Sequence, residues 1–409
     1  MNVRLSLVLT ICFSTTILFG QIVNPKKVRF GKISDAELEL TEYALQPDAD
    51  AVVLFDEGKA RMEYDISTGG FEMVMERHYR IKILKAAGTS YGDYSLLLEH
   101  STNTPSKEDV NSIKGVIFNV ENGKAVETKL TKESIFREEI SDRLDRLTIS
   151  FPQVKEGSII DLKYVFTSDF LYSLPTWYFQ REIPTDYSFF EAVIPEYYYY
   201  NLDMKGYASG RLTENVVGEI GNRSITAGAS NNQQLSFSTR GYRWGAKEVL
   251  GIANEVFAPP VRNYFFRVDF ELASVNFPGQ LGTHFSHTWE DVTETYRLNA
   301  NIRPYLNPRQ EVEVLASGWA EGQTETMARL VSIFEGVKER VSWNGSHRMM
   351  PVQSPTVLLK NSSGSSAEVN GLLMSALRAE GFQAFPVLSS TRSNGYLSIT
   401  RPSLSQFNH

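Results

Sequence analysis

The sequence contains a single cysteine, Cys12, in a chain of 409 residues. Cys12 lies inside the apolar run Leu5 to Phe19, which follows Arg4 and precedes the small residue Gly20. A basic residue, a short apolar run and a small residue are typical of a secretory signal peptide. We therefore expect residues 1–20 to be removed. The mature chain would then lack any thiol, which excludes disulfides, thiolate metal sites and a cysteine nucleophile.

Long hydrophobic runs and basic clusters are also missing. After residue 20 no stretch has the roughly 18 apolar residues that a membrane-spanning helix needs. The formal net charge of −7 and the lack of a lysine- or arginine-rich block argue against a nucleic-acid partner. No phosphate-binding loop or dinucleotide fingerprint occurs, so we predict no cofactor. We expect an exported protein of the periplasm or cell envelope, with a retained N-terminal anchor as the alternative.

The composition is that of a folded protein. Hydrophobic residues make up 42% and aromatic residues 12% of the chain, which is enough apolar surface for sizeable cores. Because the length exceeds what one core usually organises, we expect two domains.

The first part of the chain carries strand patterns. In "FEMVMERHYRIKIL", from Phe71, apolar residues alternate with charged ones, and we expect His78, Arg80 and Lys82 to face solvent. Asn122-Gly123 lies between apolar segments, which indicates a tight hairpin because both residues tolerate positive φ. Many short strands at this spacing predict an antiparallel β-sandwich.

After about residue 276 the pattern changes to helices. Thr288 is a candidate N-cap, followed by acidic residues in the first turn. A second helix is predicted from the apolar stripe Met327, Leu330, Phe334, Val337 and Val341. A third begins near Ser366 and stops at Gly381, and the strand "QAFPVLSST" at 383–391 follows it. Helices gathered before strands predict an α+β domain.

These motifs resemble two known families. The segments "ERHYRIKIL", "FPQVKEGSIIDLKYVF" and "WYFQREIPTDYSFFEAVIPE" resemble the exported bacterial DUF3857 family. The segments "WNG" at 343–345, "GSSAEVNGLLMSALRAEGFQAFPVLSSTRSNG" and "FNH" at 407–409 resemble the transglutaminase-like fold. The resemblance implies a DUF3857-like β-sandwich over residues 21–275. It also implies a papain-like α+β domain over residues 276–409, incomplete at its C-terminus.

The resemblance also implies a place for a catalytic site. Transglutaminase-like enzymes carry a cysteine at the start of this helix and a histidine on a following strand, and these positions match Ser366 and His409. A helix N-terminus contributes at most about 2 kcal/mol to an anion, too little to ionise a hydroxyl near neutral pH. We therefore favour Ser366 as an N-cap, and we keep Ser366 with His409 as a hydrolytic pair as the alternative.

Two histidines near the start of the first predicted helix are candidate metal ligands. His284 and His287 precede Glu290 and Asp291 at a spacing that suits zinc, but no second histidine pair supports them. We predict surface histidines in a loop there, and no metal.

The sequence thus predicts a non-catalytic exported protein, a pseudoenzyme that binds or scaffolds a peptide, protein or glycan at the cell envelope. The expected binding surface surrounds Trp343, Ser366 and His409. The alternative is a transglutaminase-like acyltransferase or peptide hydrolase that uses Ser366 and His409, or residues beyond position 409. A third possibility is a purely structural second domain, with the β-sandwich carrying the interaction.

Overall fold

The computed structural model describes residues 25–409, apart from residues 66–67, 173, 207–210, 228–232, 256–257, 286–287, 393 and 400–401. The predicted signal peptide and His287 lie outside the described residues. The chain divides into two compact units, and each consists of three segments. The first unit comprises Met1–Leu171, Ile183–Glu196 and Ala208–Gly251, and the second comprises Tyr172–Glu182, Tyr197–Tyr207 and Ile252–His409.

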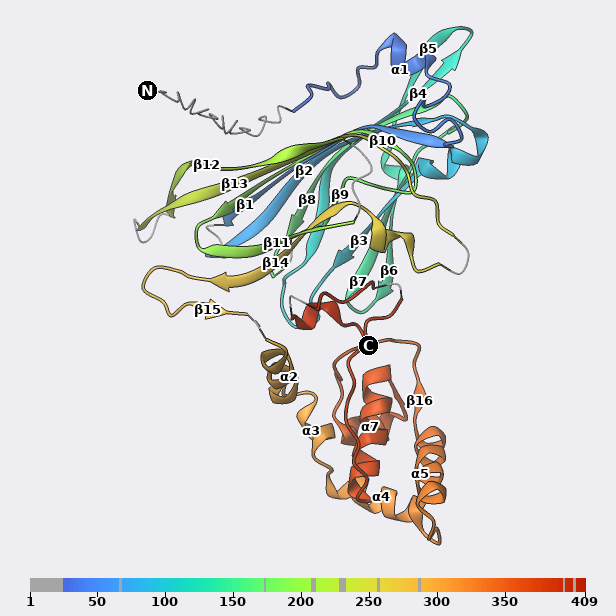
Figure 1. Ribbon diagram of the computed structural model, residues 1–409, viewed down its shortest axis with the longest axis vertical. Helices are drawn as coiled ribbons and strands as arrows, with labels where there is room; N and C mark the ends of the chain where they lie inside the picture. Colours follow the sequence, from blue (N-terminus) through green and yellow to red (C-terminus); the bar gives the residue numbers. More distant parts are fainter. Residues whose placement is uncertain are drawn as a thin grey trace, which may run out of the picture. The chain divides into compact units, whose positions relative to one another are not determined.

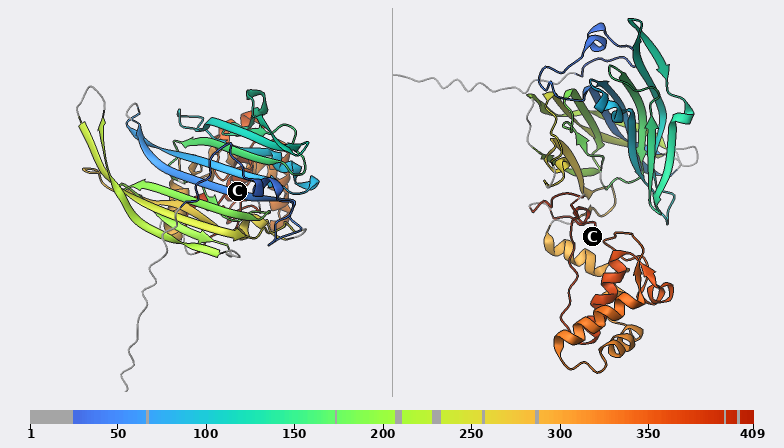
Figure 2. Two further views of the ribbon diagram at one scale, coloured as in Figure 1. Left: turned by 90° about the horizontal axis from the view of Figure 1, so that it is seen from above. Right: turned by 90° about the vertical axis from the view of Figure 1, so that its right-hand side faces the viewer.

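A large twisted sheet dominates the first unit (Figures 1 and 2). Its strand order is β12-β13-β10-β1-β2-β8-β4-β5. The strands are β1 (Ala51–Asp65), β2 (Gly70–Ile83), β4 (Glu108–Glu121), β5 (Lys124–Lys129), β8 (Ile159–Ser168), β10 (Thr185–Pro195), β12 (Arg211–Ala227) and β13 (Gln233–Val249). Strands β1 and β10 pair in parallel, so the prediction of a purely antiparallel architecture is wrong for this pair.

A smaller sheet contacts the large one in the same unit. It has the order β3-β7-β6, with β3 (Asp93–Glu99), β6 (Ile135–Ser141) and β7 (Leu144–Ser150). The hydroxyls of Tyr94 on β3 and Tyr164 on β8 lie 2.9 Å apart and join the two sheets. Short helices complete the unit: α1 (Asp35–Glu39), η1 (Ala86–Gly92) and η2 (Lys132–Ser134).

Two local predictions in this unit are confirmed, and a third is wrong. Asn122 and Gly123 join β4 to β5 with φ angles of 50° and 74°, as a two-residue hairpin turn requires. The segment from Phe71 forms strand β2, as expected. However, His78, Arg80 and Lys82 on this strand are buried and do not face solvent, because residues 25–43 cover that face.

The second unit begins with a small sheet in the order β11-β14-β15, with β9 also paired to β14. Its strands are β9 (Trp177–Tyr178), β11 (Tyr198–Lys205), β14 (Arg267–Val275) and β15 (Thr283–His284), with the short helix η3 (Val261–Tyr264) before β14. His284 pairs with Ser274 at the end of this sheet. It therefore belongs to a strand, whereas Glu290 and Asp291 belong to the following helix.

A helical region completes the second unit. It contains α2 (Trp289–Leu298), α3 (Arg303–Leu306), α4 (Gln310–Ala320), α5 (Thr326–Arg340), α6 (Pro355–Asn361), α7 (Ser366–Ala379), η4 (Leu404–Gln406) and the short strands β16 (Ser342–Trp343) and β17 (Ser363–Gly364). Thr288 caps α2 through a capping box with Asp291, as predicted. In α5 the buried residues are Ile333, Gly336 and Val337, whereas Met327 and Phe334 are exposed, so the predicted stripe is partly wrong.

Helix α7 lies in the core of this region and ends where the sequence predicts. Leu372 and Ala376 are fully buried on it, together with Tyr305 of α3 and Leu358 of α6. Gly381 has a φ of 84°, and the N–H groups of Gly381 and Phe382 donate to the carbonyls of Arg378 and Leu377. This pair of bonds is a Schellman motif, which stops the helix at the glycine.

The predicted strand at 383–391 does not form. That stretch carries no strand pairing, although Ser389 exchanges main-chain hydrogen bonds with His409. The chain as a whole is α+β, with mixed β-rich sheets followed by a helical region. In the described part of the chain, no helix has both the length and the apolarity needed to span a membrane.

Candidate functional site

The start of helix α7 is built from three consecutive small residues. At Gly364 a side chain would collide with Leu358 of α6, so the glycine permits close packing there. Ser365 has extended backbone and precedes the helix, and its N–H donates to the Glu368 carboxylate at 2.6 Å. Ser365 therefore occupies the N-cap position, and the prediction that Ser366 is the N-cap is wrong by one residue.

The Ser366 hydroxyl bonds to a neighbouring loop. Its Oγ accepts the Arg348 N–H at 3.1 Å and donates to the Arg348 carbonyl oxygen at 3.3 Å. The Ser366 N–H in turn donates to the Ser346 carbonyl at 3.0 Å. The side chain is buried, at 8% exposure. Both hydrogen-bonding functions of the hydroxyl are thus used to fix the loop at 346–348 against the helix.

Glu368 anchors a second loop to the same helix turn. Its buried carboxylate accepts the N–H groups of Val352 at 2.8 Å and Gln353 at 2.7 Å, besides that of Ser365. Burial works to raise the pKa of Glu368, but the backbone hydrogen bonds from Gln353, Ser365 and Val352 outweigh it and lower this pKa. The carboxylate is therefore a charged structural element under the cleft.

A cleft opens beside this helix start. A cavity of about 260 Å³ is lined by residues of α7, by the 348–349 loop, by residues 385–388 and by His409. A larger cavity of about 750 Å³ adjoins it, with walls from α2, α3 and Phe407. The two cavities share a mostly apolar wall formed by Tyr296, Phe385, Pro386 and Leu388. Ser366 and His409 both line the smaller cavity, so the structure brings these two predicted residues together.

Trp343 does not line the cavity itself, and the His347 ring lies between it and His409. His347 is not among the residues singled out from the sequence. The His347 ring lies 4.8 Å from the Trp343 ring and 5.3 Å from the His409 ring, measured between centroids. The Trp343 indole N–H donates to the Ser346 carbonyl at 2.9 Å. The one sequence feature that could have indicated His347 is its position four residues after Trp343, in the segment before α6. A row of three rings therefore leads toward the cleft.

His409 keeps one side-chain nitrogen unused. Its Nδ1 is buried and has no hydrogen-bond partner among the described residues. Its main chain is held by Ser389, whose N–H donates to the His409 carbonyl at 2.7 Å. The Ser366 hydroxyl donates its proton toward Arg348, so its hydrogen bonding is not that of a serine activated by an imidazole.

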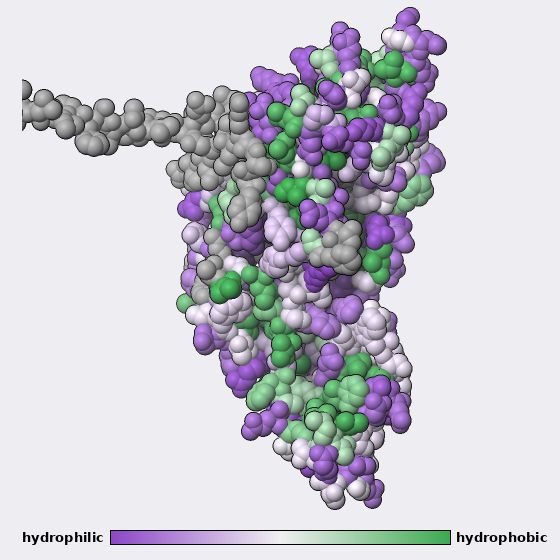
Figure 3. All heavy atoms as spheres, turned by 45° about the vertical axis from the view of Figure 1, so that its right-hand side comes forward, coloured by the Kyte–Doolittle hydropathy of each residue, from purple (hydrophilic) through white to green (hydrophobic). Residues whose placement is uncertain are grey.

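Residues 385–388 present free backbone to the cleft. Within the described part of the chain, no hydrogen bond reaches the main chain of these residues. Phe385 and Val387 are 73% and 83% exposed. Hydrophobic side chains also stand among hydrophilic ones on the surface of the helical region (Figure 3). The N–H groups of Phe385, Val387 and Leu388 and the carbonyls of this segment can pair with another strand, whereas Pro386 has no N–H to donate.

Metal ligands are not grouped at this site. Among the described residues no cluster of three or more histidine, cysteine, aspartate or glutamate side chains could hold a metal ion.

Comparison with a family model identifies part of the chain. Residues 71–234 match a model described as "Domain of Unknown Function with solved-structure structure (DUF3857)". This part of the chain is a DUF3857 domain. The match begins in β2 and ends in β13, so the DUF3857 domain covers most of the large sheet, and the helical region with the cleft lies outside it.

Solved structures match larger parts of the chain, at 10–13% sequence identity. A crystal structure described as a "putative protease" from Parabacteroides distasonis matches 81% of this chain with a TM-score of 0.51 and 11% sequence identity. The chain spans 59% of that protein's length. A "putative nutrient binding protein" from Legionella pneumophila and native yeast LTA4 hydrolase match with TM-scores of 0.24 and 0.22, at 10% and 13% identity. They cover 81% and 66% of this chain, and 95% and 35% of their own.

No curated protein matches the chain. The Parabacteroides structure indicates a shared fold.

Proposed function

We propose that the cleft beside α7 binds an extended peptide without covalent chemistry, in an exported protein of the cell envelope. The observation that carries this proposal is the pair of hydrogen bonds between the Ser366 hydroxyl and the Arg348 backbone. A serine nucleophile needs its proton directed at a base, and here the hydroxyl proton is directed at a carbonyl oxygen. The position that the transglutaminase-like resemblance assigns to a nucleophile thus has a structural role.

The free backbone of residues 385–388 favours a peptide over a glycan. A peptide strand would satisfy these main-chain groups by pairing with this segment, and its side chains would enter the two cavities. The wall shared by the two cavities supplies aromatic and aliphatic contacts for such side chains. The larger cavity is also lined by Arg297, Arg303 and Arg378.

Peptide binding can be tested with one variant and a matched control. Asn370 is exposed on α7 and lines the smaller cavity, so Asn370→Trp should fill the cavity without disturbing the core. Asn301 is exposed outside both cavities, and Asn301→Trp makes the same change there. Extended peptides and envelope glycans would be screened by thermal shift, where a ligand at 100 times its Kd stabilises by about 2.7 kcal/mol.

We expect peptides to raise the melting temperature of the wild type and of Asn301→Trp, and not that of Asn370→Trp. Shifts that persist in Asn370→Trp would place the binding surface elsewhere. Shifts with glycans alone would replace the peptide with a glycan as the ligand.

A hydrolase is the second candidate, because Ser366 and His409 line one cavity and the Parabacteroides structure is described as a "putative protease". Peptide hydrolysis would be measured for the wild type and Ser366→Ala. We expect neither protein to hydrolyse the peptides. Hydrolysis by the wild type that disappears in a folded Ser366→Ala protein would reverse the order of the two candidates.

A further inference from the structure

The N-terminal segment of the first unit lies across the face of the large sheet. We call residues 25–43 the N-terminal strap. Val28 packs against a cluster formed by Phe55, Tyr187 and Phe189. Further along, Phe30, Ile33 and Leu38 pack against Val116, Phe118 and Ile159. The strap therefore covers strands from both halves of the sheet.

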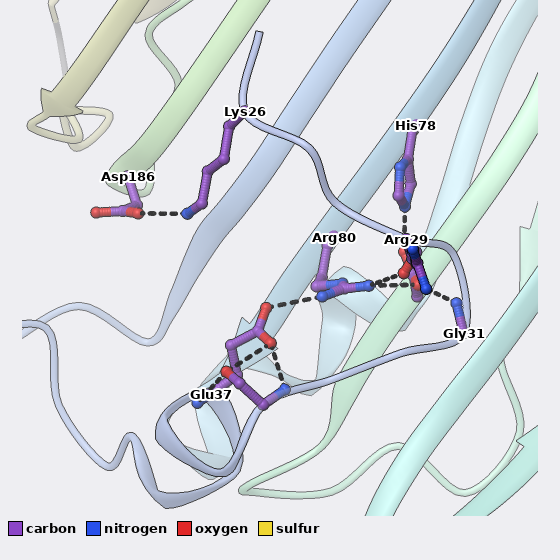
Figure 4. Close-up of polar contacts among 9 residues, drawn as sticks. Lys26, Arg29, Gly31, Glu37, His78, Arg80 and Asp186 are labelled. Carbon is purple, nitrogen blue, oxygen red and sulfur yellow. Dashed lines mark hydrogen bonds and ion pairs between the residues drawn. The ribbon is translucent and has the colours of Figure 1, made fainter.

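Beneath the strap, Arg80 on β2 is held from three sides (Figure 4). One guanidinium nitrogen donates to Glu37 Oε1 at 2.8 Å. The other donates to the Arg29 carbonyl oxygen at 2.9 Å and to Asp161 Oδ2 at 2.8 Å. Two of these three acceptors belong to the strap, so the strap supplies a carboxylate and a carbonyl to a cation that is only 2% exposed.

The neighbouring groups on the sheet contact the strap backbone in the same way. Asp161 on β8 accepts the Gly31 N–H at 2.8 Å, and its other oxygen lies 2.6 Å from His78 Nε2. Lys82 Nζ donates to the Leu38 carbonyl at 2.9 Å. At the far end, Lys26 Nζ lies 3.8 Å from Asp186 Oδ2 (Figure 4).

These contacts are those of a peptide-recognition groove. The sheet supplies side-chain donors to two strap carbonyls, an acceptor to one strap N–H and a cation to one strap carboxylate. Charged side chains such as Arg80 and Lys82 are rarely buried unless partners satisfy them, and here backbone groups of the strap are among those partners. The groove thus contacts a backbone that turns at Gly31, where φ is 72°, and continues into the acidic helix α1.

We propose that this groove is a peptide-binding site, occupied within the chain by its own strap and able to accept the strap segment of a second copy. Every contact made within one chain is available between two chains, because the segment is identical. The strap of the same chain competes at high effective concentration, so a segment from outside binds only while the strap is open. Its apparent Kd equals the intrinsic Kd divided by the open fraction.

This relation gives a quantitative test on the full mature chain. Lys26→Gln with Glu37→Gln removes the strap's ion pairs to Asp186 and Arg80, and glutamine at position 37 still suits the capping box of α1. Lys27→Gln with Glu39→Gln makes the same charge changes at exposed residues of the strap that form no ion pair with any described residue. The probe is a fluorescent synthetic peptide with the sequence of residues 25–43.

Hydrogen exchange of residues 25–43 measures strap opening, and fluorescence anisotropy measures peptide binding. We expect the open fraction of the strap to rise about tenfold in the Lys26/Glu37 variant, because the buried Arg80 loses its ion pair with the partly exposed Glu37. The apparent affinity for the peptide should rise by the same factor. The Lys27/Glu39 variant should match the wild type in both measurements. Unchanged protection of β1 and β2 would show that the sheet stays folded.

Two results would overturn the proposal. One is a strap that opens in the Lys26/Glu37 variant while the peptide fails to bind, since the emptied groove would then have no affinity for this segment. The other is an open fraction of the strap equal to that of the control variant, since the contacts to Arg80 and Asp186 would then not hold the strap.

Discussion

Glu368 and Ser365 close the first turn of α7 on itself, with the Glu368 carboxylate 2.6 Å from the Ser365 nitrogen. The same carboxylate accepts the N–H groups of Val352 and Gln353. One buried charge thus joins the helix start to the loop before α6. The wall of the cleft depends on this junction, because the 346–349 loop is itself fixed to the helix by Ser366.

We predict that Glu368→Gln lowers the free energy of unfolding by about 1–3 kcal/mol. The amide keeps one acceptor oxygen, but its NH₂ group must then face an N–H donor of Ser365, Val352 or Gln353. Urea denaturation measures the loss. The control is Glu339→Gln on the exposed face of α5, which should change stability by less than about 0.5 kcal/mol. Equal effects of the two substitutions would show that the junction contributes nothing.

The strap should loosen in acid. Burial works to raise the pKa values of Asp161 and Glu37, but hydrogen bonds from His78 and Arg80 to Asp161, and from Arg80 and Ser34 to Glu37, outweigh it and lower both. A carboxyl whose pKa is lower in the folded than in the unfolded state stabilises the folded state fully at pH values above its unfolded-state pKa. This contribution is lost as the pH falls through its folded-state pKa.

Hydrogen-exchange protection of residues 25–43, corrected for the intrinsic rate, should therefore decline from about pH 4 downward while the protection of β1 persists. The Lys26/Glu37 variant should show a smaller decline because one of the two carboxyls is gone. Protection that stays constant to about pH 3 would contradict a role for these carboxylates.

The comparison of sequence and structure separates local signals from long-range ones. The cap at Thr288, the stop at Gly381 and the turn at Asn122-Gly123 were predictable, because each depends on a few adjacent residues. The burial of His78 and Arg80 was not predictable from the alternation of β2. It results from a segment about 40 residues earlier with a single five-residue helix and no clear periodicity.

The start of helix α7 was predictable from the sequence, and Ser366 and His409 line one cavity beside it. The role of these two residues stays a prediction. The N-cap was misplaced by one residue because Ser365 and Ser366 are equally good caps by type, and only the loop carrying Arg348 distinguishes them. A strand was predicted from the sequence at 383–391, but a strand also needs a partner. Among the described residues the main-chain partners of this segment are limited to His409 and Asn408 beside Ser389.

Ser366→Ala should lower the stability of the protein, and we expect no catalytic activity to be lost with it. The substitution leaves the N–H and C=O of Arg348 without this partner, at a cost of about 1–2 kcal/mol. Ser375→Ala is the control on the same helix, because the buried Ser375 hydroxyl has no hydrogen-bond partner in the described structure. Its removal should be neutral or slightly stabilising. Thermal denaturation of both variants checks the difference, and equal melting temperatures would contradict the structural role of Ser366.

The packing of α5 on α4 gives a matched pair of glycine substitutions. A Cβ at Gly336 would overlap the indole ring of Trp319, whereas a Cβ at Gly318 meets no atom within 4 Å. Alanine in a helix interior is favoured over glycine by about 1 kcal/mol. Gly318→Ala should therefore raise the free energy of unfolding by up to that amount. Gly336→Ala should lower it by about 1–3 kcal/mol, because a core already filled by Trp319 has to move.

Urea denaturation of the two variants measures this difference in sign. The Trp319 fluorescence should also change in Gly336→Ala and stay constant in Gly318→Ala, since only the former displaces the indole. Stabilisation by both substitutions would mean that α5 and α4 do not pack closely at Gly336. In that case the helical region that carries the cleft would be looser than its buried residues Ile333 and Val337 indicate.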